Sequence, residues 1–142
     1  MREAARNRGG IGGEYGGGPG HVGNAMRSDV EILTDTMGVD FAPYMQRVIQ
    51  AIRENWYTLI PESARSPLFK QGNVYIQFII DKDGKVSGMR LEGPSGDVAL
   101  DRAAWGGITA SNPFPPLPQQ FRGPNIALRI RFMYNPSKSE LQ

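Results

Sequence analysis

Cysteine is absent from the sequence, and histidine occurs once, at His21. Without cysteine the chain has no disulfide, no thiolate nucleophile and no thiolate metal ligand. A lone histidine makes a poor metal site and a poor general base. Carboxylates are available at Asp81, Asp83 and Asp101, but no nucleophile–base pattern accompanies them. We therefore expect a protein that is not an enzyme, and we predict no catalytic residue, no cofactor and no metal.

Long apolar runs and a strong net charge are also lacking. The uncharged run from Ala103 to Phe121 contains four prolines, so it cannot be a membrane helix, which needs about 20 mainly apolar residues. The N-terminus shows no apolar signal-peptide region. A net charge of +2 does not demand a nucleic-acid partner. With 142 residues, 39% of them hydrophobic, the sequence predicts one domain with a modest core.

Glycine is concentrated in residues 1–27, where almost no apolar side chain is available for burial. We expect residues 1–27 to form a disordered Gly-rich tether, residues 28–136 to form the folded domain, and residues 137–142 to form a flexible tail. Arg2, Arg6 and Arg8 beside the glycines leave a second interpretation open, an Arg-Gly segment that contacts RNA.

A β-hairpin is predicted between residues 73 and 93. The first strand places one set of alternating apolar residues on a single face: Val74, Ile76, Phe78 and Ile80. Asp83-Gly84 suits a tight reversal, because a glycine tolerates positive φ. In the return strand the apolar phase slips between Val86 and Met89, so we expect a bulge at Gly88 that returns Met89 and Leu91 to one face.

Two segments show the apolar spacing of helices. The first follows a candidate N-cap at Asp40, and the second follows one at Asp97. Their apolar stripes are Met45, Val48, Ile49, Ile52 and Trp56, and then Val98, Leu100, Ala103, Ala104 and Ile108. Trp56 is predicted to lie in the core rather than to form a ligand platform.

Two connecting segments are less regular. Residues 30–36 are a short apolar run that fits either a small edge strand or a strap over the sheet. Residues 111–117 carry too many prolines for a helix or a central strand, so we predict a stiff extended connection. A ligand for an SH3-like domain is the alternative for this proline-rich segment.

The last strand is the most regular of the three, since Ile126, Leu128, Ile130 and Phe132 alternate with Ala127, Arg129, Arg131 and Met133. The predicted order is helix-strand-strand-helix-strand. A right-handed crossover from the second strand to the third leaves the first strand central. We therefore predict an α+β, two-layer fold in which a three-stranded antiparallel sheet carries two helices on one face. The third strand then lies at an edge with unpaired N–H and C=O groups.

A set of short motifs accompanies this pattern: Phe41-Ala42-Pro43-Tyr44, Asn55-Trp56-Tyr57, Asp83-Gly84-Lys85-Val86, Leu100-Asp101-Arg102-Ala103-Ala104 and Asn112-Pro113-Phe114-Pro115-Pro116-Leu117-Pro118. In their order and spacing, and with the final strand, they resemble the C-terminal domain of the TonB/TolA family, most closely a TonB-family energy transducer. The resemblance covers residues 30–136.

The resemblance implies a periplasmic binding module, anchored to the inner membrane in full-length members. Such a module couples the proton-motive force of an ExbB–ExbD-like motor to an outer-membrane TonB-dependent transporter, whose TonB box pairs with the exposed third strand. Carried to this sequence, the partner-binding residues are Ile126, Ala127, Leu128, Arg129, Ile130, Arg131, Phe132, Met133 and Tyr134. The resemblance implies no nucleic-acid partner, and it is compatible with a homodimer.

This sequence also departs from the family pattern. It contains neither the N-terminal membrane helix nor the long proline-rich spacer of family members, so we expect Met1 to mark an internal start or a boundary within a longer protein. The Tyr-Pro pair that begins many TonB domains is missing, and Trp105-Gly106-Gly107 replaces a small-residue helical run. Asn55-Trp56 is closer to TolA, so a TolA-like tether of the Tol–Pal system stays open as an alternative. A small RNA-binding domain is a third hypothesis, although the central strands lack paired surface aromatics.

Overall fold

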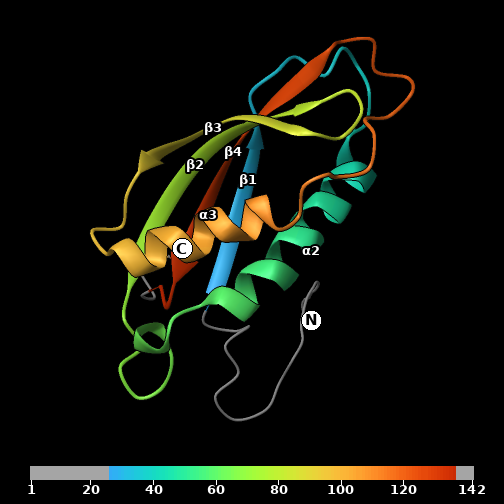
Figure 1. The fold of residues 1–142 in the computed structure, drawn as a ribbon. Coiled ribbons are helices and arrows are strands. Elements are labelled where there is room, and N and C mark those ends of the chain that lie inside the picture. The colour runs from blue at the N-terminus through green and yellow to red at the C-terminus, as the bar shows by residue number, and fades with distance from the viewer. Residues whose placement is uncertain (1–25, 137–142) are drawn as a thin grey trace.

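The computed structural model describes residues 26–136. Its elements in chain order are β1 (Met26–Ile32), α2 (Ala42–Leu59), the 3-10 turn η1 (Glu62–Ala64), β2 (Gly72–Asp81), β3 (Val86–Gly93), α3 (Val98–Thr109) and β4 (Asn125–Tyr134). Figure 1 shows two layers, in which α2 and α3 lie on one face of a twisted sheet. The predicted α+β class and two-layer arrangement are therefore confirmed. Residues 1–25 and 137–142, expected as tether and tail, lie outside the described residues.

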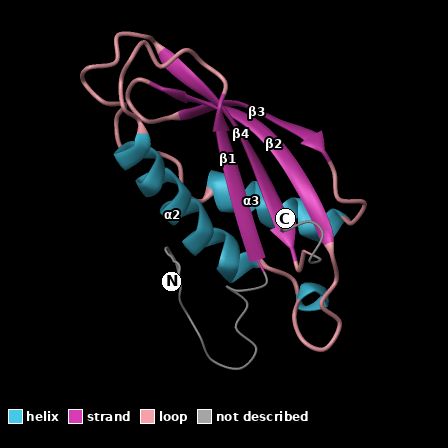
Figure 2. Cartoon of the chain, turned by 180° about the vertical axis from the view of Figure 1, so that it is seen from behind, coloured by secondary structure: helices cyan, strands magenta, loops and turns pink. Residues whose placement is uncertain are grey.

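The sheet has four strands rather than the predicted three, in the order β1-β4-β2-β3. All neighbouring strands are antiparallel. Figure 2 views the open face of the sheet, which is the face without helices, and shows β1 beside β4. The additional strand begins at Met26 and ends at Ile32. It therefore starts inside the range expected as tether, and it overlaps only in part with the segment 30–36 that was expected as an edge strand or strap.

The core lies between the sheet and the helices because each central strand alternates its side chains between two environments. On β2 and β4 the inward apolar side chains are fully buried against α2 and α3, as the alternation predicts. They are Val74, Ile76, Phe78, Ile80, Ile126, Leu128, Ile130 and Phe132. Trp56 of α2 is also fully buried, which confirms its predicted place in the core.

The hairpin between β2 and β3 forms at the predicted turn. Gly84 has φ +97°, and its N–H donates to the Asp81 carbonyl oxygen at 2.8 Å. Gly88 has φ +63°, and the pairing of β2 with β3 shifts register around it, which confirms the bulge. Met89 packs against the core, but Leu91 is 38% exposed, so the return strand buries less than its pattern predicts.

The proline-rich connection folds over the tip of this hairpin. The N–H of Phe114 donates to the Gly84 carbonyl at 2.8 Å, and that of Leu117 donates to the Lys82 carbonyl at 3.0 Å. The Tyr44 hydroxyl of α2 donates to the Pro115 carbonyl at 2.7 Å, and burial raises the pKa of Tyr44 to about 12. Because Phe114 and Leu117 are buried, the segment acts as a structural clamp and is not displayed as an SH3 ligand.

The two helices approach closely where α3 carries glycine. A Cβ added to Gly107 would lie 2.9 Å from the Trp56 Cβ, so only glycine permits this approach. The carboxylate of Asp97 caps the start of α3 by accepting from the N–H groups of Ala99 and Leu100, as predicted. Despite Gly106 and Gly107 the helix continues to Thr109. The glycines therefore serve packing and do not end the helix early.

Candidate strand-pairing site

The predicted partner-binding residues, 126–134, all lie in β4, but β4 is not at an edge of the sheet. It pairs with β2 on one side and with β1 on the other. The β1 register runs from Met26 opposite Tyr134 to Ile32 opposite Leu128. The prediction of a free third-strand edge was therefore wrong, and the physical reason is that a strand close to the chain's N-terminus already occupies that edge.

The side chains of β4 alternate between the two faces of the sheet as the sequence predicts, but the burial of one of them differs from the expected pattern. Ala127, Arg129 and Arg131 lie on the face opposite the helices and are partly exposed. Met133 belongs to the same face by alternation, yet it is only 2% exposed, and Tyr134 is fully buried. The C-terminal end of β4 is therefore packed on both faces, and its open part runs from Ala127 to Arg131.

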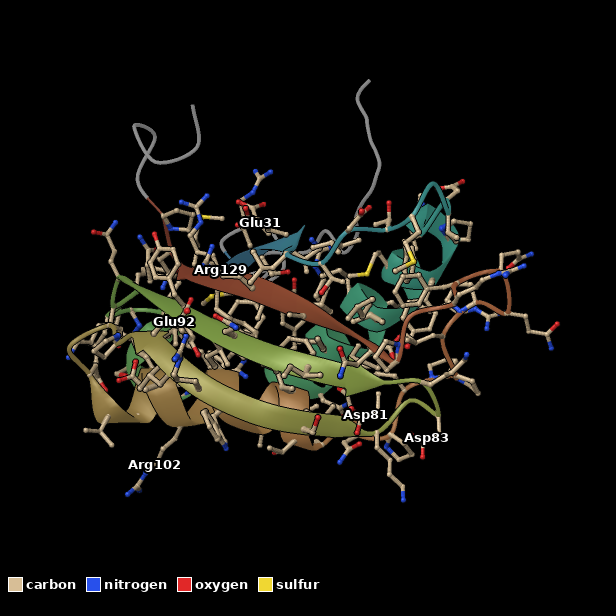
Figure 3. The ribbon with its side chains drawn as sticks, turned by 90° about the horizontal axis from the view of Figure 1, so that it is seen from above. Glu31, Asp81, Asp83, Glu92, Arg102 and Arg129 are labelled. Atoms are coloured by element: carbon tan, nitrogen blue, oxygen red, sulfur yellow. The ribbon has the colours of Figure 1, made fainter. Side chains whose placement is uncertain are left out.

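Ion pairs connect the strands across this open face. The Arg131 Nη2 donates to the Asp29 carboxylate of β1 at 2.6 Å. Arg129 lies between two acids, with 2.7 Å from its Nε to Glu92 of β3 and 3.2 Å from its Nη1 to Glu31 of β1. Figure 3 shows Glu31, Arg129 and Glu92 in a row across the sheet. The hydrogen bond from Arg129 holds the pKa of Glu92 below its usual range.

On the face of the sheet that the helices cover, few side chains of β1 are fully buried. Met26 and Ser28 are its only buried side chains, whereas Val30 and Ile32 are half-buried. The Arg53 Nε of α2 donates to the Ser28 hydroxyl at 3.1 Å. After the strand, the Leu33 N–H donates to the Ala127 carbonyl at 2.8 Å, and the Ala127 N–H donates to the Thr34 hydroxyl at 2.8 Å. Backbone pairing and exposed charges therefore hold β1 more than core packing does.

A shallow hollow marks the seam between β1 and β4 on the open face. It is lined by Asp29, Val30, Glu31, Tyr75, Arg129 and Arg131. Arg131 is about one-third exposed, and its hydrogen bonds with Asp29 and with Tyr75 raise its pKa. The hollow is open and most of its lining residues are charged, so it suits the edge of a peptide better than an enclosed small molecule.

The two outer edges of the sheet differ in regularity. β3 forms one edge, and its pairing with β2 is interrupted by two register shifts, which make a poor template for another strand. β1 forms the other edge, and its pairing with β4 runs without a shift. The described part of the chain therefore offers two places for an added strand, either outside β1 or on β4 in place of β1.

The acidic residues weighed as catalytic groups have structural partners. Asp81 accepts from the Ser87 hydroxyl, Asp83 accepts from the Lys85 N–H, and Asp101 accepts from the Ser95 hydroxyl. Figure 3 shows Asp81 and Asp83 at the hairpin tip, away from Arg129. Within residues 26–136 no group of three metal-ligating side chains comes together. None of the helices in that range has the length and apolarity to cross a membrane.

Comparison with known proteins assigns the fold to a family. The family described as TonB C terminal matches residues 41–132, which is more than half of the chain. This chain belongs to the TonB C-terminal family. The solution structure of the Helicobacter pylori TonB C-terminal domain is similar, with a TM-score of 0.52 and 22% sequence identity, over 71% of this chain and 87% of that one. At this identity the likeness concerns the fold alone. No curated protein matches the chain.

The TonB match leaves out β1. It begins at Phe41 and ends at Phe132, so it contains both helices, β2, β3 and most of β4. Within the matched part alone, β4 is an edge strand of the sheet, as the sequence predicts. β1 therefore covers an edge that the matched TonB unit leaves open.

The side chains of Asn55 and Trp56, the pair that suggested the TolA alternative, make their hydrogen bonds inside the TonB domain. Asn55 donates to the Ser111 hydroxyl at 2.9 Å, and the Trp56 Nε1 donates to the Tyr134 hydroxyl at 2.7 Å. These contacts join α2 to the segment that follows α3 and to β4. The pair therefore stabilises the fold, and it gives no surface evidence for a Tol–Pal partner.

Proposed function

We propose that this TonB domain binds a short extended segment of an outer-membrane transporter along β4, at Ala127 to Arg131, and that the segment takes the place of β1. The domain receives force from an inner-membrane ExbB–ExbD-like motor through a segment outside residues 26–136, and it passes that force to the transporter in the periplasm. The observation that carries the proposal is the regular edge of β4, which is occupied by a strand outside the family match.

Exchange of one strand for another costs little because the main-chain hydrogen bonds lost by β1 are remade by the partner. Three of the seven side chains that β1 gives up are exposed, and its ion pairs with Arg129 and Arg131 are surface pairs worth at most about 1 kcal/mol each. The losses of burial are those of Met26 and Ser28, together with the half-buried Val30 and Ile32, which pack against the core. Replacement of β1 is therefore an accessible step that leaves α2, α3 and the other strands in place.

The same competition weakens the apparent affinity. A main-chain hydrogen bond contributes about 1 kcal/mol net, and ordering of the free segment offsets much of the total. Because β1 is tethered beside β4, the apparent Kd is raised further by the small fraction of molecules in which β1 has left. We therefore expect micromolar or weaker binding, which suits a coupling that must release after each cycle.

A cysteine crosslink distinguishes the proposed place from the outer edge of β1. Because the natural chain has no cysteine, single cysteines at Ala127 (β4), Asp29 (β1) and Arg47 (α2) each report one surface. Peptides from the periplasmic segments of the source organism's outer-membrane transporters carry one cysteine at successive positions. We expect the Ala127→Cys chain to form disulfides at alternate peptide positions, as side chains on one face of a paired strand do.

The two other variants are the matched controls. A strand added outside β1 would crosslink to Asp29→Cys in a regular register and would leave Ala127→Cys unreacted, which contradicts the proposal. Crosslinks with no register, or crosslinks as abundant from Arg47→Cys as from Ala127→Cys, would also contradict it.

A further inference from the structure

The place that β1 occupies on β4 is bordered by three arginines from two elements. Arg129 and Arg131 project from β4 on the open face. Arg53 reaches it from α2 on the helix side, with its Nε 3.1 Å from the Ser28 hydroxyl and its Nη2 3.5 Å from the Ser28 carbonyl. A strand in this place therefore runs between guanidinium groups on both faces of the sheet.

The sequence of β1 complements these arginines position by position. Asp29 stands opposite Arg131 and Glu31 stands opposite Arg129 in the register, and both carboxylates make the corresponding ion pairs. Between them Val30 turns toward the helices, and Ser28 supplies the acceptor for Arg53. On the open face, β1 thus carries an acid at each position opposite an arginine and Arg27 opposite Met133, whereas small or apolar residues face the helices.

On the basis of the proposed function, we infer that the partner segment which replaces β1 is acidic, with two carboxylates two residues apart facing Arg131 and Arg129. The spacing of two residues is the same whether the segment lies parallel or antiparallel to β4, because side chains alternate in both directions. A neutral segment would leave Arg131 without the carboxylate that it has in the free domain, whereas a neutral hydroxyl and a main-chain carbonyl are enough for Arg53. β1 therefore serves as a built-in copy of the ligand's charge pattern.

The two carboxylates of the partner segment should differ in how much they contribute to binding. When β1 leaves, Arg129 keeps the Glu92 carboxylate of β3, at 2.7 Å. Among the described residues, the one acid that forms an ion pair with Arg131 is Asp29, at 2.6 Å, and it leaves with β1. The carboxylate that faces Arg131 therefore contributes more to partner selection than the one that faces Arg129.

The test uses the full 142-residue chain carrying Asp29→Asn and Glu31→Gln, which weakens the hold of β1 and leaves β4 unchanged. The probe is a synthetic heptapeptide with the sequence of residues 26–32, Met-Arg-Ser-Asp-Val-Glu-Ile. Three further peptides replace its aspartate by asparagine, its glutamate by glutamine, or both. Binding is followed by backbone amide shifts in NMR, up to millimolar peptide, at low and at high salt. A Glu54→Gln/Glu62→Gln chain has the same charge change at exposed positions outside β1 and is the control for net charge.

We expect the aspartate-to-asparagine peptide to bind about two- to five-fold more weakly at low salt, and the glutamate-to-glutamine peptide to lose less than two-fold. Both differences shrink at high salt because exposed charges are screened. An Arg131→Glu chain should reverse the preference and favour a peptide with lysine in place of the aspartate. Arg47→Glu, on the exposed face of α2, should not change the order of affinities.

Equal affinity for all four peptides, with shifts centred on β4, would overturn the inference that the partner segment is acidic and would leave the proposed function standing. Absence of binding by every peptide to a folded chain, shown by dispersed amide signals, would overturn both that inference and the site on β4. If the double variant fails to fold, the single Asp29→Asn chain gives the same comparison for the position that faces Arg131.

Discussion

Substitution of Gly84 by valine is expected to lower the free energy of unfolding by about 3 kcal/mol or more. Gly84 has φ +97°, a backbone conformation that a β-branched residue adopts only with strain. A Cβ at this position would also lie 2.0 Å from the Phe114 carbonyl oxygen and 3.0 Å from that of Pro115. These are backbone atoms, so they can move only if the clamp over the hairpin opens. Chemical denaturation followed by tryptophan fluorescence measures the loss.

Gly96 provides a matched control for this substitution. Its φ is +94°, but nothing lies within 4 Å of the position where a Cβ would be. Gly96→Val therefore carries the backbone strain without the collision, and we expect a loss of about 1–2 kcal/mol. Equal losses for the two variants would show that strain alone matters and that the proline-rich clamp does not constrain the hairpin tip.

Trp56→Ala is expected to cost about 3–5 kcal/mol. The Trp56 side chain is fully buried, and its ring meets those of Phe132 and Tyr134 edge-on at centroid distances of 4.9 and 5.2 Å. Its Nε1 donates to the Tyr134 hydroxyl at 2.7 Å, and that hydroxyl donates to the Leu100 carbonyl at 2.7 Å. Removal of the ring creates a cavity and breaks this chain of hydrogen bonds between α2, β4 and α3.

The other tryptophan, Trp105, tests whether the loss depends on position. It lies on α3 and is 36% exposed, so Trp105→Ala should cost less than about 1.5 kcal/mol. Tyr134→Phe and Trp56→Phe, each alone and both together, isolate the hydrogen bond as a coupling of about 1 kcal/mol. Similar midpoints for Trp56→Ala and Trp105→Ala in urea would contradict the central place given to Trp56.

Local sequence signals were sufficient for most of the elements. Asp83-Gly84 and Gly88 indicated the turn and the bulge, Asp97 indicated the start of α3, and the alternation from Ile126 to Phe132 indicated β4. Each of these rests on a preference of the backbone or on the burial of neighbouring residues. They could therefore be predicted without knowledge of the partner strand.

β1 could be predicted only in part, because its stability comes from residues about 100 positions away in the chain. Arg27, Asp29 and Glu31 are charged, and charged residues give a weak strand signal on their own. Pairing of β1 with β4 becomes favourable because Arg131 and Arg129 stand opposite Asp29 and Glu31. The glycines before Met26 also extended the expected tether past the start of the strand. Sequence reasoning thus located β4, the strand that we propose binds the partner, but missed what occupies its edge.

A reversible lock on β1 tests the central claim most directly. Arg27 and Met133 are Cα partners in the register of β1 with β4, so Arg27→Cys with Met133→Cys places two thiols within disulfide reach. A second lock, Gln77→Cys with Arg90→Cys, joins β2 to β3 and leaves β1 free. The measurement is the affinity of the same transporter peptide, without its cysteine, for each chain, oxidised and reduced, because a free thiol would exchange with the lock.

If the partner replaces β1, oxidation of the Arg27–Met133 lock is expected to weaken binding at least about ten-fold, and reduction is expected to restore it, because a strand tied to β4 cannot leave. Oxidation of the Gln77–Arg90 lock is expected to leave the affinity unchanged. Binding of equal strength to the oxidised and reduced forms of the first lock would contradict the account, because the partner would then bind while β1 remains on β4.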